Sequence, residues 1–415
     1  MFLSHLSLTH FRNYQKLELD FSGPLTLFQG ENAQGKTNLL EAVYYLATSK
    51  PVHAQTEREI VDWLAEDEPI PFCRVAATVL TGAGSRPLEL EIVLSQRGEG
   101  GTFQKQIKIN GSSKRSLDLV GQMRAVLFLP EDIKLVDGSP GERRRYLDIA
   151  LCQISREYTR ALSQCQKVMT HRNGLLKTLR EQNARPNDPH VESQLAFWDE
   201  QLTTHGSVVL VQRHQFVQQL EQIARQRHLE LSDEREQLTL QYLPSFNLGD
   251  MSEADYAWLK ENRLERIEPI AGEIALTADQ VQRQFMAKLA SRRGREIAAG
   301  NTLYGPHRDD LRFLVNGRDL RTYGSRGQQR TAALSLKLAE VQAMTAATGA
   351  APLLLLDDVM SELDAVRRAT LLTALENVPQ ALLTTTDWED FTPEFRTRAQ
   401  LFTVAKGAVH PLQTD

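Results

Sequence analysis

The chain has 415 residues, of which 41% are hydrophobic and 24% are charged, and its formal net charge at pH 7 is −5. This length predicts two or three domains, and the composition excludes an intrinsically disordered chain and a membrane-embedded one. An acidic net charge does not indicate a nucleic-acid-binding protein, so any such interpretation depends on local charge.

The cysteines and the N-terminal segment bear on the cellular compartment. Cys73, Cys152 and Cys165 lie far apart and form no C-x-x-C pair, which favours a reducing compartment and argues against a zinc site. Residues 1–14 lack the apolar run of a signal peptide, and no stretch reaches the roughly 18 apolar residues of a transmembrane helix. We therefore expect a cytoplasmic protein with no membrane partner.

Strand patterns dominate the N-terminal part of the chain. Apolar and polar residues alternate in 17–21, and similar segments follow a first predicted helix at 38–46. These later segments are the predicted strands 74–80, 88–94, 104–110 and 125–129.

Helical patterns dominate the middle of the chain. Residues 142–182 and 191–230 carry apolar residues at three- and four-residue steps, and the Pro/Asn turn at 185–189 joins them. Two long helices with a short connection predict an antiparallel hairpin arm. A predicted strand at 238–243 and a helix at 277–299 follow.

Strand patterns return after Tyr304, so segments of α/β character enclose a helical middle. The predicted elements in this last part are strands at 311–315, 353–356, 381–386 and 401–404 and helices at 327–346 and 365–375.

The segment 24–37 reads PLTLFQGENAQGKT and carries the strongest motif. A short strand leads into a complete G-x-x-x-x-G-K-[ST] loop, formed by Gly30, Glu31, Asn32, Ala33, Gln34, Gly35, Lys36 and Thr37. Before a helix, the N–H groups of such a loop face phosphates. We expect Lys36 to reach the β- and γ-phosphates of a nucleotide and Thr37 to bind Mg²⁺. A chance glycine turn is the alternative, and the loop alone does not say what the nucleotide is used for.

A second motif is the apolar run 353–356, which ends in Asp357 and Asp358. A buried strand with an acidic end is the usual partner of a phosphate loop, because it places a carboxylate beside the metal ion. We expect Asp357 to bind Mg²⁺, directly or through water, and Asp358 to polarise the attacking water. The alternative is an ordinary strand exit with solvated carboxylates.

A third motif, Ser325-Arg326-Gly327-Gln328, opens the predicted helix that precedes the acidic strand. Ser325 can donate its hydroxyl, Gly327 lets a phosphate approach the backbone, and a helix N-terminus favours anions. An ordinary helix N-cap is the alternative. A fourth motif, S-E-L-D at 361–364, follows Asp358, and the sequence does not distinguish a functional turn from a cap there.

The phosphate loop, S-x-G-Q, acidic strand and S-E-L-D occur in the order that resembles the ABC-type ATPase heads of the SMC superfamily. Other stretches resemble the RecF family of bacterial DNA replication and repair proteins. They are LTHFRNY at 8–14, LFLPED at 127–132, GERRRYLD at 141–148, HRNGLLK at 171–177 and GPHRDD at 305–310. The resemblance implies an α/β fold: an ABC-type P-loop ATPase head formed by residues 1–138 and 301–415, with an inserted, mainly helical arm domain at 139–300.

The resemblance also implies a function. Two ATP molecules would be sandwiched in a homodimer, with Ser325, Gly327 and Gln328 of one subunit on the γ-phosphate held by the other. The protein would be a weak DNA-dependent ATPase acting as a switch in recombinational repair and replication-fork maintenance. It would bind double-stranded DNA and single/double-strand junctions, associate with the nucleoid, and help RecR and RecO to load recombinase.

Three positions depart from the pattern of ABC heads. Asp358 stands where most of these proteins have glutamate, and the shorter carboxylate predicts slow hydrolysis. No histidine follows the predicted strand that begins at Ala381, where many ABC proteins carry one. No clear Q-loop glutamine is present, and Glu131 or Asp132 is the candidate for its place.

Local charge marks two candidate DNA-binding regions. Residues 141–185 hold ten Lys/Arg against four acidic residues, residues 281–330 hold eleven against four, and residues 186–280 hold seven against 17. Basic side chains that converge where the arm meets the head would bind phosphates without reading sequence. The candidates are Arg143, Arg144, Arg145 and Arg172. Solvated helix faces are the alternative.

The clusters at 171–173 and 307–310 lack the ligand spacing of a zinc site, so we expect them to be structural, to face DNA, or to link the head to the arm. Two alternative functions fit the sequence less well. A structural SMC-type tether needs much longer coiled-coil arms than the two predicted helices. A small-molecule P-loop kinase needs an acceptor pocket and leaves the motif at Ser325 unexplained.

Overall fold

The computed structural model describes residues 1–54, 56–67, 70–82, 86–96, 103–261, 276–375 and 378–412. By their contacts, residues 1–132, 152–154 and 334–415 form one compact unit, and residues 133–151 and 155–333 form a second. The second unit therefore takes in residues 301–333, beyond the arm boundary expected from the sequence, because the strand at 310–315 pairs with the strand at 238–243. The domain limits expected from the sequence, at 138/139 and 300/301, stay a prediction.

An antiparallel sheet in the order β2-β1-β4-β5-β6-β7 forms part of the first unit. Its strands are β1 (Phe2–Phe11), β2 (Tyr14–Asp20), β4 (Phe72–Leu80), β5 (Leu88–Gln96), β6 (Phe103–Ile109) and β7 (Ser112–Lys114). The alternation that predicted strands has its cause here, since Leu17 and Leu19 of β2 are buried while Glu18 and Asp20 are exposed. Asn110 and Gly111 make the hairpin turn between β6 and β7, with φ values of 50° and 73°.

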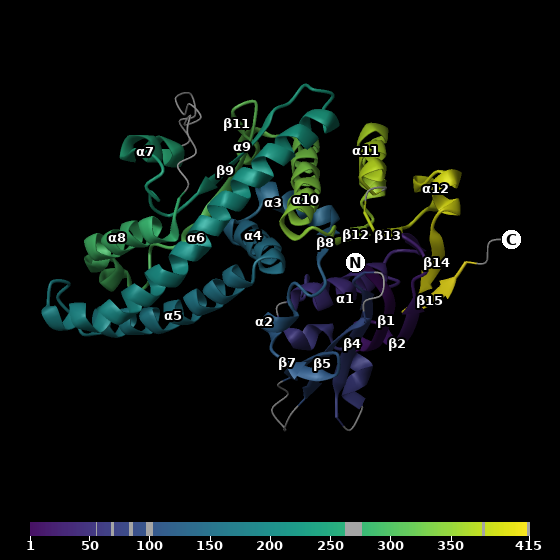
Figure 1. Cartoon of the computed structure of the whole chain (residues 1–415), viewed down its shortest axis with the longest axis horizontal. Helices are drawn as coiled ribbons and strands as arrows, with labels where there is room; N and C mark the ends of the chain where they lie inside the picture. The colour runs from purple at the N-terminus through teal and green to yellow at the C-terminus, as the bar shows by residue number, and fades with distance from the viewer. Residues whose placement is uncertain are drawn as a thin grey trace. The chain divides into compact units, whose positions relative to one another are not determined.

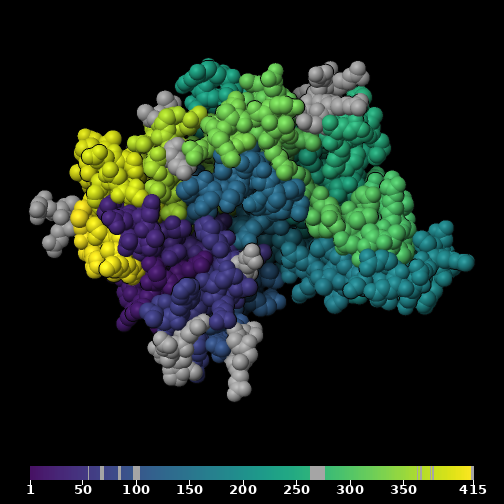
Figure 2. All heavy atoms as spheres, turned by 180° about the vertical axis from the view of Figure 1, so that it is seen from behind, coloured from purple at the N-terminus to yellow at the C-terminus, as the bar shows by residue number. Residues whose placement is uncertain are grey.

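The other sheet of the first unit has the order β15-β14-β3-β13-β12-β8 and is parallel except for β15. Its strands are β3 (Leu25–Gln29), β8 (Ala125–Phe128), β12 (Leu353–Asp357), β13 (Ala381–Thr385), β14 (Gln400–Ala405) and β15 (Ala408–Pro411). All residues of β8, β12 and β13 are buried, as expected of parallel strands covered on both faces. Because β3 lies between β13 and β14, early and late parts of the chain share one sheet. On the surface, yellow C-terminal residues lie against purple N-terminal ones (Figure 2).

Helix α1 (Lys36–Thr48) contacts strands of both sheets and is buried along most of its length. The remaining helices of the first unit are α2 (Ser116–Leu119), α11 (Ala365–Leu375) and α12 (Pro393–Thr397), and α10 (Arg326–Thr348) passes from the second unit into the first.

The second unit is mainly helical. Its helices are α3 (Lys134–Asp137), α4 (Pro140–Ile154), α5 (Arg156–Glu181), α6 (Pro189–Leu231), α7 (Glu253–Glu261), α8 (Ala278–Ala299) and α9 (Leu320–Tyr323). Helices α5 and α6 lie side by side as the expected hairpin, and α8 contacts both (Figure 1). A small sheet in the order β11-β10-β9 completes the unit, with β9 (Leu238–Leu243), β10 (Asp310–Val315) and β11 (Arg318–Asp319).

The predicted continuous helix over 142–182 is wrong at one point. Ser155 has φ −130° and ψ 111°, so α4 ends before it. Its side chain accepts a hydrogen bond from Tyr158 N at 3.0 Å and caps α5. Across the described parts of the chain, we find no helix with the length and apolar character needed to cross a membrane.

Candidate nucleotide site and basic clusters

The predicted phosphate loop connects β3 to α1, which is the strand–loop–helix context that the motif requires. Gly35 has φ 118°, and a Cβ atom there would lie 2.6 Å from the side-chain nitrogen of Asn13. At Gly30 a Cβ atom would lie 2.3 Å from the carbonyl oxygen of Val404. Both glycines therefore allow a close approach of other backbone and side-chain atoms to the loop.

Residues from two other turns hold the loop in place. Asn13 Nδ2 donates to the Gln34 carbonyl at 2.9 Å, and Asn13 Oδ1 accepts from Asn38 Nδ2 at 2.8 Å. Lys406 N donates to Gln34 Oε1 at 2.7 Å, and Gly407 N donates to the Gln34 carbonyl at 3.0 Å. No sequence pattern predicted the supporting role of these residues, although Asn13 lies within the LTHFRNY stretch.

The loop threonine meets the acidic end of β12. Thr37 Oγ1 donates to Asp357 Oδ2 at 2.7 Å, and Asp357 Oδ1 accepts from Thr384 Oγ1 of β13 at 2.7 Å. The meeting follows from the parallel sheet, since β3, β12 and β13 all end at the same edge. A hydroxyl and a carboxylate are ligands suited to Mg²⁺, which takes its other ligands from phosphates and water. Within the described residues no cluster of three or more His, Cys, Asp or Glu could hold a metal ion by itself.

The loop lysine is buried. Lys36 Nζ donates to the carbonyl oxygens of Gly30 at 2.5 Å and of Glu31 at 3.0 Å. Burial lowers the pKa of Lys36, while the carboxylates of Asp358 and Asp357 act in the opposite direction. The lysine thus brings one positive charge to the floor of the loop, close to two carboxylates.

Asp358 has the features expected of a group that acts on water. Its φ of 48° places it in the left-handed region, which is uncommon for a residue other than glycine. Its Oδ1 atom is buried and has no hydrogen-bond partner within the described residues. Burial raises the pKa of Asp358, and the charge of Lys36 opposes this rise. A buried, unpartnered carboxylate oxygen beside a phosphate loop is a candidate general base.

These side chains line one hollow of about 300 Å³. Its lining includes Asn32, Ala33, Gly35, Lys36, Thr37, Asp357 and Asp358 from the predicted site, together with Asn38, Pro130 and Glu131. The two candidates for the Q-loop place separate here. Glu131 lines the hollow, whereas Asp132 accepts a hydrogen bond from Leu129 N at 2.8 Å and stabilises its own turn.

The Ser325 motif forms the helix N-cap that was the alternative interpretation, and it also remains accessible. Ser325 Oγ accepts from Gln328 N at 3.2 Å, and Ser325 N donates to Gln328 Oε1 at 2.9 Å, which is a reciprocal capping box. Ser325 and Gly327 are nevertheless exposed. The cap and the exposure are compatible, because the Ser325 hydroxyl accepts in the cap and keeps its own proton to donate.

The S-E-L-D segment contains a turn and a cap. Ser361 Oγ donates to the Asp358 carbonyl at 2.8 Å, and Asp364 Oδ1 accepts from Arg367 N at 3.0 Å at the start of α11. The side chain of Glu362 lies outside the described residues. This segment thus ties α11 directly to the residue that follows Asp357.

The DNA-binding role predicted for two of the four arginines is wrong, because the structure buries both side chains in ion pairs. Arg172 is 0% exposed and contacts Asp199 and Glu296, each at 2.7 Å, and Thr302 at 2.9 Å. Arg143 is 2% exposed and contacts Asp310 at 2.6 Å.

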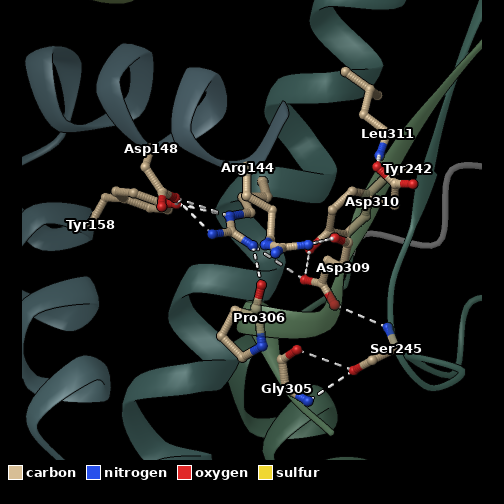
Figure 3. Close-up of polar contacts among 11 residues, drawn as sticks. Arg144, Asp148, Tyr158, Tyr242, Ser245, Gly305, Pro306, Asp309, Asp310 and Leu311 are labelled. Carbon is tan, nitrogen blue, oxygen red and sulfur yellow. Dashed lines mark hydrogen bonds and ion pairs between the residues drawn. The ribbon is translucent and has the colours of Figure 1, made fainter. Parts of the chain in front are cut away.

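The other two arginines differ from each other. Arg144 is partly buried and donates to the Asp309 carbonyl at 2.7 Å (Figure 3). Arg145 is exposed. Of the four candidates, Arg145 is therefore the one whose side chain lies open to solvent.

A third buried arginine of this region was not among the residues predicted from the sequence. Arg213 of α6 is buried and donates to Asp148 Oδ1 and to the Pro306 carbonyl, both at 2.7 Å. Asp309 accepts from Tyr242 Oη and from Ser245 N (Figure 3). Burial raises the pKa of Asp309, and Arg213 opposes the rise. Arg172 and Asp309, buried members of the clusters at 171–173 and 307–310, thus have structural roles, one of the roles expected for these clusters.

Comparison with known proteins identifies the family. Residues 2–408 match the family described as RecF/RecN/SMC N terminal domain. The chain is 41% identical to the DNA replication and repair protein RecF of Chloroflexus aurantiacus, covering 99% of both chains. It is 39% identical to the protein of the same name from Latilactobacillus sakei, covering 100% of both.

Solved structures agree with this assignment. The recombination mediator protein RecF with ATPrS, described in the RecFOR pathway, superposes with a TM-score of 0.80 at 30% identity and covers 99% of this chain and 98% of its own. The SmcHead bound to the C-winged helix domain of ScpA superposes with a TM-score of 0.51 at 13% identity, covering 100% and 98%, and indicates the fold alone. The chain has an ABC-type α/β head with a helical arm, and it belongs to the RecF family of SMC-like proteins.

Proposed function

We propose that this protein binds ATP with Mg²⁺ at residues 30–37 and that ATP closes two copies on DNA. The observation that carries the proposal is the 2.7 Å hydrogen bond between Thr37 and Asp357, which lie 320 positions apart in the sequence. It joins a phosphate-loop hydroxyl to a strand-end carboxylate, as a magnesium–nucleotide site requires. The similar solved structures of RecF-ATP and RecF-ATPrS support the same ligand.

The residues that line the hollow have different roles in nucleotide binding and hydrolysis. Thr37 and Asp357 hold the metal ion, which neutralises phosphate charge when bound. Lys36 and the loop N–H groups bind and orient the phosphates. Asp358 accepts a proton from the attacking water, because its carboxylate has an unpartnered oxygen and a raised pKa. Aspartate is shorter than the glutamate of most ABC heads, so we expect slow turnover that serves a switch.

Ser325 and Gly327 contact the nucleotide that is bound to the second copy of the chain. Both residues are exposed, and neither lines the hollow of its own chain. A serine hydroxyl and a glycine N–H at the start of a 23-residue helix suit a phosphate supplied by another subunit. Contacts to two γ-phosphates stabilise the closed dimer, and hydrolysis removes them, so the nucleotide shifts the equilibrium between two states.

The proposed DNA-binding surface does not include Arg143 and Arg172, because both are buried. We propose that Arg145 and exposed basic residues of α5 contact phosphates without reading bases. The exposed basic residues of α5 are Arg156, Arg160, Lys167, Lys177 and Arg180. The names of the relatives, which describe DNA replication and repair, support double-stranded DNA and its junctions as ligands. The similar solved RecF structures are described in the RecFOR pathway, which supports RecR and RecO as partners.

The test is the molar mass in solution with ATP, Mg²⁺ and duplex DNA, for the wild type and Ser325→Arg. Ser291→Arg is the matched control, because Ser291 is an exposed serine of α8 in the same unit. We expect a DNA-bound dimer for the wild type and for the control, and an ATP-bound monomer for Ser325→Arg. A wild type that stays monomeric with ATP refutes the switch. Turnover that ignores DNA and consumes a small phosphate acceptor instead supports a P-loop kinase.

A further inference from the structure

The side chain of Gln328 bridges Ser325 and a carboxylate from another part of the second unit. Gln328 Oε1 accepts from Ser325 N at 2.9 Å, and Gln328 Nε2 donates to Glu236 Oε1 at 2.8 Å. Only this orientation of the amide satisfies both neighbours, because the other would place its oxygen against the carboxylate and its NH₂ against an N–H group. Glu236 therefore selects the orientation in which Gln328 caps Ser325.

Glu236 is tied in turn to the end of arm helix α6. Its Oε2 atom lies 3.3 Å from Nε2 of His228, a residue of the last turn of α6 that is 0% exposed. Its backbone N–H donates to Ser232 Oγ at 3.3 Å, and that hydroxyl donates to the His228 carbonyl at 2.7 Å. Both the backbone and the side chain of Glu236 thus follow the position of α6.

Packing on the other side of Gln328 is loose. The residue lines a hollow of about 410 Å³ together with Tyr323 and Gly324, and Tyr323 is 72% exposed. A side chain with open space beside it is held by its hydrogen bonds rather than by close packing. Removal of the carboxylate would leave the amide free to turn into this space.

We propose that Glu236 is a positioning residue that couples the end of arm helix α6 to Ser325. Movement of the last turn of α6 moves Glu236, and Gln328 transmits that movement to the N–H and hydroxyl groups of Ser325. The inference rests on the proposed function, in which Ser325 receives the nucleotide of a second copy and DNA contacts the arm. It gives DNA a physical route to the dimer contact: DNA would favour dimerisation by stabilising the arm position in which Gln328 caps Ser325.

The test compares Glu236→Ala with Glu234→Asn. Glu234 is an exposed carboxylate of the same turn with φ 59°, and asparagine tolerates that backbone, so the control removes the same charge without touching Gln328. The measured quantity is the ATP concentration at half-maximal dimer, with and without duplex DNA. We expect DNA to lower it in the wild type and in Glu234→Asn. In Glu236→Ala we expect the ratio of the two concentrations to approach one and the concentration without DNA to rise about tenfold.

A residue that only stabilised the fold would weaken dimerisation with and without DNA by the same factor, so an unchanged ratio overturns the coupling. Hydrogen exchange gives a second measurement that needs no dimer. In the monomer, the amides of Ser325 and Gln328 should exchange faster in Glu236→Ala than in Glu234→Asn. Equal exchange in the two variants overturns the inference even if the wild type never dimerises, an outcome that would refute the proposed function separately.

Discussion

Replacement of Arg172 by methionine should destabilise the second unit severely. The Arg172 side chain is 1% exposed, and its loss leaves the side chains of Asp199 and Glu296, 4% and 0% exposed, without their counter-charge. Removing one partner of a buried pair costs about 3–5 kcal/mol, a large part of the 5–15 kcal/mol that stabilises a typical domain. Arg160→Met is the control, because Arg160 is an exposed residue of the same helix and should change stability by less than about 0.5 kcal/mol.

Urea unfolding followed by far-UV circular dichroism measures the difference, since the second unit is mainly helical. The double variant Arg172→Met/Glu296→Gln should recover part of the loss. A deficit below about 1 kcal/mol, or one equal to that of Arg160→Met, would refute the account of Arg172 as a buried structural charge.

Three further predictions concern the head. Lys36→Met should abolish ATP binding and ATP-dependent dimerisation in equilibrium titrations; retained affinity would exclude the phosphate-loop role. Asp358→Asn should slow phosphate release at least about 100-fold while the ATP dimer persists. Because burial raises the pKa of Asp358, wild-type turnover should fall as the pH drops through that raised value, and a profile without this limb would contradict the role. The hydrogen bond to Asp20 raises the pKa of His5. Burial partly offsets this rise, and Glu18 adds to it. The wild type should therefore gain stability over His5→Gln below about pH 6.5 and lose it as the pH rises through the raised pKa, which thermal melting across pH would reveal.

The elements of the head were predictable because their signals are local. The alternation of β2, the apolar runs of β12 and β13 and the glycine loop before α1 each specify structure within a few residues. The meeting of Thr37 and Asp357 was expected because an acidic strand end is the usual partner of a phosphate loop. The break at Ser155 was missed because a serine that caps a helix also occurs within helices, so the pattern alone does not locate the end.

The fate of the basic residues was not predictable from charge counts. Arg143 meets Asp310, 167 positions away, and Arg172 meets Glu296, 124 positions away. A count over neighbouring residues treats such arginines as surface charge, since their counter-ions come from other elements. The support of the phosphate loop by Asn13 has the same character, because a turn between other strands supplies it. Long-range pairing of polar groups was the information that the sequence patterns lacked.

The place of β3 in its sheet has a consequence for synthesis on the ribosome. Gln29, at the end of β3, donates a hydrogen bond to the carbonyl of Thr386, 357 positions later. Both strands that neighbour β3 come from the last part of the chain. At about 5–20 residues per second, the strand that carries the phosphate loop waits roughly 20–70 s for those neighbours. Its apolar residues are exposed to chaperones and to premature association during that interval. The helical unit is translated completely within the wait, so it can fold while the nucleotide site is still unformed.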